Sequence, residues 1–168
     1  REAPVLIIGY ERGEFSLGGA GNAVLNLQAL GAAPLPIGVI GRDEPGRRIA
    51  DFLRARAVPT RWLVRSAAYR TPIKMRILAG EENTRKQQVL RIDKESTVPD
   101  GGALQKKLEA ALAEAARRAD ALVVSDYNYL TVRPALYERV LPLFRERRLP
   151  LTLDSRFRLL EFGGMTAA

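Results

Sequence analysis

The segment Leu17-Gly18-Gly19-Ala20-Gly21-Asn22 places three glycines and an amide side chain at the start of a predicted helix. Glycine lets the backbone approach a ligand closely, and the first turn of a helix presents free N–H groups. The segment lacks the Gly-Lys-Ser/Thr of a P-loop and the glycine spacing of a dinucleotide-binding loop. We therefore expect either a ligand site at Gly18, Gly19 and Asn22 or a tight turn without a ligand.

A second set of polar side chains lies on a predicted β-hairpin, where residues 72–79 and 86–93 alternate in the manner of strands. Lys74 and Arg76 fall on one face of the first strand, and Gln87, Arg91 and Asp93 fall on one face of the second. If these faces coincide, their cations could bind a phosphate group. The alternative is a charged, solvated edge that discourages aggregation.

Two aspartates follow apolar strands directly. Asp126 comes after the predicted strand 121–125, and Asp154 comes after the predicted strand 149–153. Ligands of parallel sheets bind beyond the carboxyl ends of the strands, so both carboxylates are candidate site residues. The alternative for each is that it caps the helix that follows.

Composition removes several classes of site. The chain has no cysteine and no histidine, which excludes disulfides, thiolate or histidine metal sites and the Ser-His-Asp triad. The net charge of +8 raises the alternative of a nucleic-acid-binding domain, but the basic residues are scattered rather than clustered. For that reason we expect no nucleic-acid partner. We also expect no membrane partner, because no apolar run approaches the roughly 18 residues of a membrane span. A soluble cytoplasmic protein is the expectation.

The elements that must position these residues alternate between strands and helices. Strands at 35–40, 121–125 and 149–153 are almost wholly apolar, which predicts an α/β fold with a mostly parallel sheet covered by helices on both faces. We expect Asp43 to cap a helix that has Pro45 in its first turn. Segments at about 4–16, 60–65 and 72–93 are predicted to form a small antiparallel flap. We treat residues 1–168 as a single, partial domain.

The motifs together resemble the PfkB/ribokinase family of sugar kinases. The resemblance begins with the glycine segment and continues through Leu30-Gly31 and the run Gly38 to Gly46. Within the family the chain is most similar to the heptose 7-phosphate kinase domain of ADP-heptose synthases. The similar segments, in chain order, are Glu2-Ala3-Pro4-Val5, Thr71 to Arg76, Gln87 to Asp93, Val123 to Tyr127, and Leu153-Asp154.

This resemblance implies a ribokinase-like fold and transfer of the ATP γ-phosphoryl group, with Mg²⁺, to a hydroxyl of a sugar or sugar phosphate. Heptose 7-phosphate, phosphorylated at C1, is the implied substrate. It also implies a homodimer formed through the flap. The implied substrate-binding residues are Gly18, Gly19, Asn22, Lys74, Arg76, Arg91 and Asp126, and Asp154 is the implied contact to the cofactor.

The resemblance also implies that the chain is a fragment. The family's opening strand is expected upstream of Arg1. Its second signature, Asp-Thr-x-Gly-Ala-Gly-Asp, carries the catalytic base and is expected downstream of Ala168. We therefore assign no catalytic base and no metal ligand here, and we expect the fragment alone to be inactive. The open alternatives are a ribokinase- or fructokinase-like kinase and a noncatalytic sugar-binding or regulatory relative.

Overall fold

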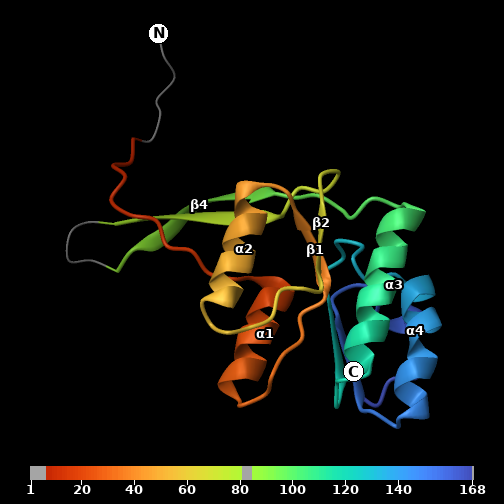
Figure 1. Cartoon of the computed structure of the whole chain (residues 1–168). Coiled ribbons are helices and arrows are strands. Elements are labelled where there is room, and N and C mark those ends of the chain that lie inside the picture. The colour runs from red at the N-terminus through yellow and green to blue at the C-terminus, as the bar shows by residue number, and fades with distance from the viewer. Residues whose placement is uncertain (1–6, 81–84, 168) are drawn as a thin grey trace.

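The computed structural model describes residues 7–80 and 85–167, and strands alternate with helices along most of this length (Figure 1). The elements in chain order are α1 (Gly19–Ala29), β1 (Gly38–Gly41), α2 (Glu44–Arg54), β2 (Leu63–Ser66), β3 (Ile73–Ala79), β4 (Gln87–Lys94), α3 (Gly102–Ala116), β5 (Leu122–Asp126), α4 (Pro134–Glu146), β6 (Leu151–Ser155) and the 3-10 turn η1 (Leu159–Glu161).

Two parallel strand pairs form the centre of the molecule. Strand β1 pairs with β2 through the crossover helix α2, and β5 pairs with β6 through α4. In Figure 1, α1 and α2 lie on one side of these strands and α3 and α4 lie on the other. The prediction of an α/β fold with parallel strands, helices on both faces and a small antiparallel sheet is confirmed. Within the described residues, no helix combines the length and apolar character needed to cross a membrane.

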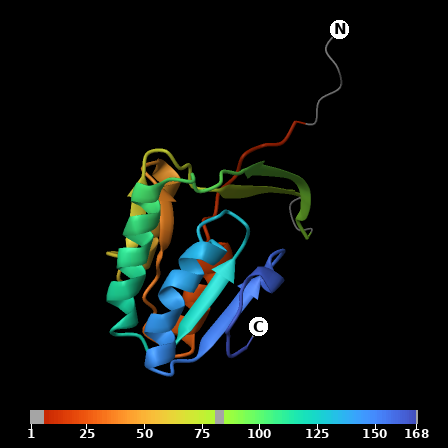
Figure 2. The same ribbon diagram turned by 90° about the vertical axis from the view of Figure 1, so that its right-hand side faces the viewer.

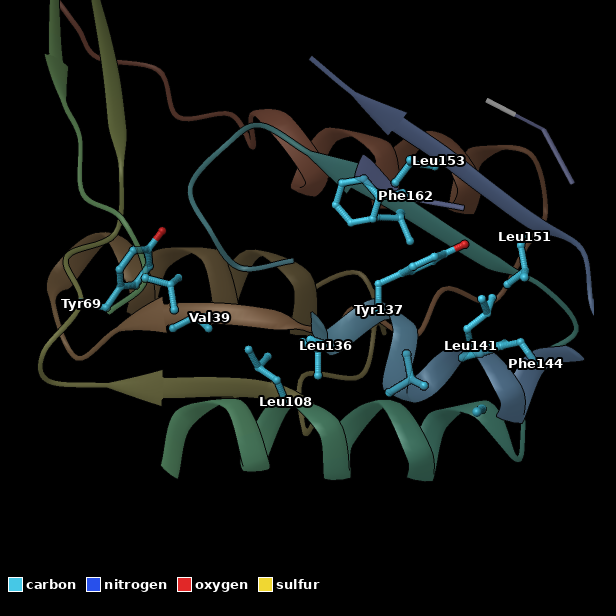
Figure 3. Close-up of a cluster of buried hydrophobic side chains, with 14 residues drawn as sticks. Val39, Tyr69, Leu108, Leu136, Tyr137, Leu141, Phe144, Leu151, Leu153 and Phe162 are labelled. Atoms are coloured by element: carbon cyan, nitrogen blue, oxygen red, sulfur yellow. The ribbon is translucent and has the colours of Figure 1, made fainter. Parts of the chain in front are cut away.

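The main core lies between the β5–β6 pair and the helices α3 and α4 (Figure 3). Helix α4 buries one apolar face, because its large side chains recur at helical spacing. The ring of Tyr137 packs edge-to-face on Phe162, with the ring centroids 5.4 Å apart. A smaller cluster of Leu17, Leu53 and Val58 lies under the other side. Leu17 immediately precedes residues 18–22, which we call the glycine turn. Its burial therefore anchors the glycine turn to the core of the protein.

Helix α2 begins as the sequence predicts. The carboxylate of Asp43 accepts a hydrogen bond from the Gly46 N–H at 3.0 Å, and proline occupies the first turn. Replacing Gly46 by any other residue would force the backbone to shift, because a Cβ there would lie 2.4 Å from the carbonyl oxygen of Gly41. The end of β1 and the first turn of α2 are therefore in close contact.

The antiparallel flap consists of β3 and β4 alone, and it projects from the body as a two-stranded hairpin (Figures 1 and 2). The prediction that residues 60–65 belong to the flap is wrong. That segment contributes to β2, which pairs in parallel with β1, Val64 lying opposite Val39. The reason is the crossover through α2, which returns the chain in the direction of β1.

The predicted strand at 4–16 is also wrong over its described part. Residues 7–18 take no helix or strand, and Ile7 and Tyr10 are 92% and 86% exposed. The segment contains Gly9 and Gly13 and three charged residues, a composition that disfavours a strand, and no neighbouring strand pairs with it. Residues 4–6 of this prediction and the similar segment Glu2 to Val5 lie outside the described residues.

Candidate functional site

The glycine turn opens helix α1 and exposes its N-terminus. Gly18 is the N-cap, with an extended backbone, and no side chain among the described residues caps the helix there. Helix α1 starts at Gly19, inside the glycine segment. Asn22 is exposed in the first turn of α1, where the first backbone N–H groups of a helix lack helical partners.

Gly19 requires its glycine for conformation. Its φ is +51°, in the left-handed region that L-residues other than glycine rarely adopt. A Cβ at Gly19 would lie 3.4 Å from Cδ2 of Tyr127, the first residue after β5. The ring of Tyr127 is 42% exposed. The turn therefore contacts the loop that leaves the carboxyl end of the sheet, where ligands of parallel sheets bind.

Asp126, the last residue of β5, is buried with its carboxylate fully engaged. One carboxylate oxygen accepts the Asn128 N–H at 2.9 Å, and the other accepts the Ser155 hydroxyl at 2.9 Å. Its carbonyl also accepts the Arg156 N–H at 3.2 Å. Asp126 thus ties the ends of β5 and β6 together and shapes the loop that holds Tyr127.

Asp154 is placed differently from Asp126. It lies opposite Ser125 in the parallel register of β5 and β6, and its side chain is exposed near the carboxyl end of β6. Among the described residues, no three acidic side chains are gathered to hold a metal ion. Asp154 is therefore an accessible carboxylate near the carboxyl end of the sheet.

The hairpin brings the predicted cations onto one face. In the antiparallel register Lys74 lies opposite Asp93 and Arg76 lies opposite Arg91, so the four side chains share a face. We call these four residues the cation face. Gln87 does not join it, because a bulge between Ile77 and Leu78 shifts the register and places Gln87 opposite Ala79.

Ion pairs neutralise part of this face. The ammonium group of Lys74 lies 2.7 Å from the Glu95 carboxylate and 3.0 Å from that of Asp93. The hydrogen bond to Glu95 and, to a smaller extent, the one to Asp93 raise the pKa of Lys74. The same bonds lower the pKa of each of the two carboxyl groups. Arg91 also pairs with Asp93, at 3.0 Å. Among the described residues, no carboxylate pairs with Arg76, which leaves its guanidinium as the cation of this face open to a ligand.

Tyr129 connects the hairpin to the body. Its hydroxyl donates to the Glu95 carboxylate at 3.4 Å, and its carbonyl oxygen accepts the Val98 N–H at 2.8 Å. Tyr127 of the same loop lies against Gly19. One loop therefore links the glycine turn to Glu95, the residue that pairs with Lys74 at the base of the cation face. Sequence reasoning included Tyr127 in a motif but missed this role. It also missed Glu95, because nothing local marks that residue as the partner of Lys74.

Comparison with known proteins gives consistent results. The model of the pfkB family carbohydrate kinases matches residues 4–155. Bifunctional protein HldE of Caulobacter vibrioides is 40% identical over 136 residues, which are 80% of this chain and 26% of that protein. D-beta-D-heptose 7-phosphate kinase of Bordetella bronchiseptica is 41% identical over 126 residues, 75% of this chain and 38% of that protein. The chain thus spans well under half the length of these curated relatives.

A solved structure shares the fold. Fructokinase from Xylella fastidiosa superposes with a TM-score of 0.58 over 96% of this chain and 48% of its own. The two sequences are 15% identical, so this similarity concerns the fold alone. It confirms the ribokinase-like architecture.

Proposed function

The chain belongs to the pfkB family of carbohydrate kinases, and on that premise we propose that the protein containing it phosphorylates heptose 7-phosphate at C1 with ATP. The observation that carries the proposal is the exposed, uncapped N-terminus of α1, with Asn22 beside it, set against the loop after β5. The identity of 41% to a D-beta-D-heptose 7-phosphate kinase supports the choice of substrate.

The glycine turn is the proposed site for sugar hydroxyls. Gly18 and Gly19 bring backbone N–H groups to the ligand without an intervening side chain, and the amide of Asn22 can both donate and accept. Tyr127 borders this site through its contact with Gly19. Sugars carry many hydroxyls that both donate and accept hydrogen bonds, which fits this set of groups.

The cation face is the proposed site for the phosphate of the sugar phosphate. Arg76 is the principal group, because Lys74 and Arg91 already share the carboxylates of Glu95 and Asp93. A guanidinium can bind two phosphate oxygens at once through parallel hydrogen bonds. The link through Tyr129 supports this assignment, since it attaches the base of this face to the loop beside the glycine turn.

ATP would supply the γ-phosphoryl group, and Mg²⁺ would accompany its phosphates. Phosphoryl transfer depends mainly on positioning and charge stabilisation, so the role of this chain is to hold the sugar in place. Asp126 acts by positioning the loop after β5, and the exposed Asp154 is the proposed contact on the nucleotide side. We assign no base in this chain and propose that it is inactive without the remainder of the protein, consistent with the small share of its relatives that it covers.

The hairpin also offers a surface for pairing two subunits. The face opposite the cation face carries apolar side chains beside Lys94, and Met75, Leu90 and Ile92 on it are 44%, 51% and 39% exposed. A second copy of the protein could cover these side chains in a homodimer. We expect Met75→Glu to convert a dimeric full-length protein to a monomer in light-scattering measurements, and a dimer that persists would contradict this interface.

The kinase proposal is tested with the full-length protein and purified heptose 7-phosphate, with ribose and fructose as comparison substrates. We expect ATP-dependent phosphorylation of the heptose phosphate, with Asn22→Ala raising its KM and lowering kcat. Asn26→Ala is the matched control, because Asn26 is exposed one turn further along α1. Turnover of fructose or ribose alone would assign a different sugar, and no turnover of any sugar would favour the noncatalytic relative.

A further inference from the structure

A cavity of about 540 Å³ lies between the first turns of α3 and α4, and none of the residues assigned above lines it. Asp100 and Gln105 line it from the side of α3, Arg133 and Arg139 from the side of α4, and Arg158 from the chain after β6. Figure 2 shows α3 and α4 side by side with their N-termini at the same end of the molecule. The volume is in the range of small-molecule sites.

Gln105 is the first indication of a ligand. The residue is only 8% exposed, and neither its amide oxygen nor its amide nitrogen has a hydrogen-bond partner among the described residues. A buried polar group left without a partner destabilises the fold. A methionine or leucine would fill the same place without that cost. An amide here is therefore explained by a ligand that both accepts from it and donates to it.

Two arginines on the same cavity share this property. The Nε of Arg133 and one terminal nitrogen of Arg158 are enclosed and have no hydrogen-bond partner among the residues that the structure describes. Of the six such side-chain atoms in the described residues, four belong to Gln105, Arg133 and Arg158. The cavity therefore gathers several buried polar atoms that lack a hydrogen-bond partner, whereas Trp62 and Tyr137 contribute one such atom each elsewhere.

The charges around the cavity favour an anion. Arg139 pairs with Glu109 at 3.2 Å and Arg158 with Glu161 at 2.9 Å, but the nearest carboxylate to Arg133 is that of Asp100 at 3.9 Å. That carboxylate is 83% exposed, so it compensates Arg133 weakly. No side chain in the described part of the chain caps α3 or α4, and the N-termini of both add positive potential at the cavity.

We propose that this cavity binds a small phosphorylated metabolite through its phosphate and an adjacent hydroxyl. The guanidinium groups of Arg133 and Arg158 bind phosphate oxygens, and the amide of Gln105 bonds to the hydroxyl and to a phosphate oxygen. None of these residues belongs to the glycine turn or to the cation face.

The test is a calorimetric titration of the full-length protein with glycerol 3-phosphate, which carries both a phosphate and hydroxyls. We expect saturable binding that Arg133→Met and Gln105→Met each weaken about tenfold, the loss of a single well-placed polar contact. Arg54→Met is the matched control for charge, because this arginine pairs with Asp51 on the surface of α2. It should leave the affinity unchanged.

Two further measurements keep the outcomes distinct. Gln105→Met replaces a buried orphan amide by an apolar side chain of similar size, so the free protein should keep or gain thermal stability. At the same concentration, glycerol 3-phosphate should raise the Tm of the wild type more than that of the Gln105→Met protein. Binding that is lost in Arg76→Met but unchanged in Arg133→Met would belong to the hairpin and overturn the proposal, as would a lack of saturable binding.

Discussion

Thr71 donates two hydrogen bonds to the carboxylate of Asp43, one from its N–H and one from its hydroxyl, each 2.8 Å long. The same hydroxyl accepts the Gly41 N–H at 2.8 Å. Residues 28 positions apart thereby join the end of β1, the first turn of α2 and the segment that enters the hairpin. The helix cap that the sequence predicts is also the point from which the cation face is positioned.

Removing this carboxylate should destabilise the protein. Asp43→Ala leaves the buried Thr71 hydroxyl and two backbone N–H groups without their acceptor, and we expect a loss of about 2 kcal/mol. Chemical denaturation of the full-length protein measures the change. Asp51→Ala is the matched control, since its ion pair with Arg54 is on the surface of the same helix and should contribute less than about 1 kcal/mol. Equal losses in both variants would contradict the role given to Asp43.

The contribution of Asp43 should depend on pH. Burial acts to raise the pKa of Asp43, but hydrogen bonds from the Thr71 N–H, the Thr71 hydroxyl and the Gly46 N–H outweigh it and lower the pKa. A carboxyl whose pKa is lower when folded than the roughly 3.9 of an unfolded chain stabilises the fold fully above that value. The stabilisation is lost as the pH falls through the folded pKa. The difference in unfolding free energy between wild type and Asp43→Ala should therefore shrink in acid, and a constant difference between pH 7 and 3 would refute this.

The two neighbouring glycines of the turn should differ in their tolerance of a side chain. Gly19→Ala forces alanine to adopt φ +51° and should cost about 1–2 kcal/mol. Gly18→Ala should have little effect on stability, because φ is −110° there and no atom lies within 4 Å of the added Cβ. Thermal unfolding of both full-length variants gives the comparison. A Gly19→Ala protein as stable as the wild type would show that the backbone of the turn adjusts to a side chain at this position.

The cations of the hairpin should contribute unequally to substrate binding if the proposed function is correct. Arg76→Met should raise the KM for the sugar phosphate more than Lys74→Met does, because Lys74 is already held between Asp93 and Glu95. Steady-state kinetics of the full-length enzyme with the phosphorylated sugar and its unphosphorylated analogue provide the measurement. A phosphate role requires that the effect of Arg76→Met be larger for the phosphorylated substrate. Equal effects on both substrates would speak for a structural role.

Local patterns allowed much of the candidate site to be predicted. Strand alternation placed Lys74 and Arg76 on one face, and the register confirms that Arg91 and Asp93 share it. The same reasoning failed for Gln87, because a bulge inserts a residue that no periodicity reveals. It also gave no partner for Lys74, since the choice among many carboxylates depends on how the hairpin meets the loop after β5.

Apart from the strand expected at 4–16, the sequence by itself determined the elements and their order, because hydrophobic period, glycine punctuation and the Asp43 cap act over a few residues. It also determined the family, through motifs that follow one another along the chain. Only the tertiary structure decided that β2 pairs with β1 rather than with the hairpin, and that Tyr127 contacts Gly19. It alone showed that Gln105 and Arg133 meet at one cavity. These are contacts between residues distant in the chain, and they depend on how the helices and strands pack rather than on any local pattern.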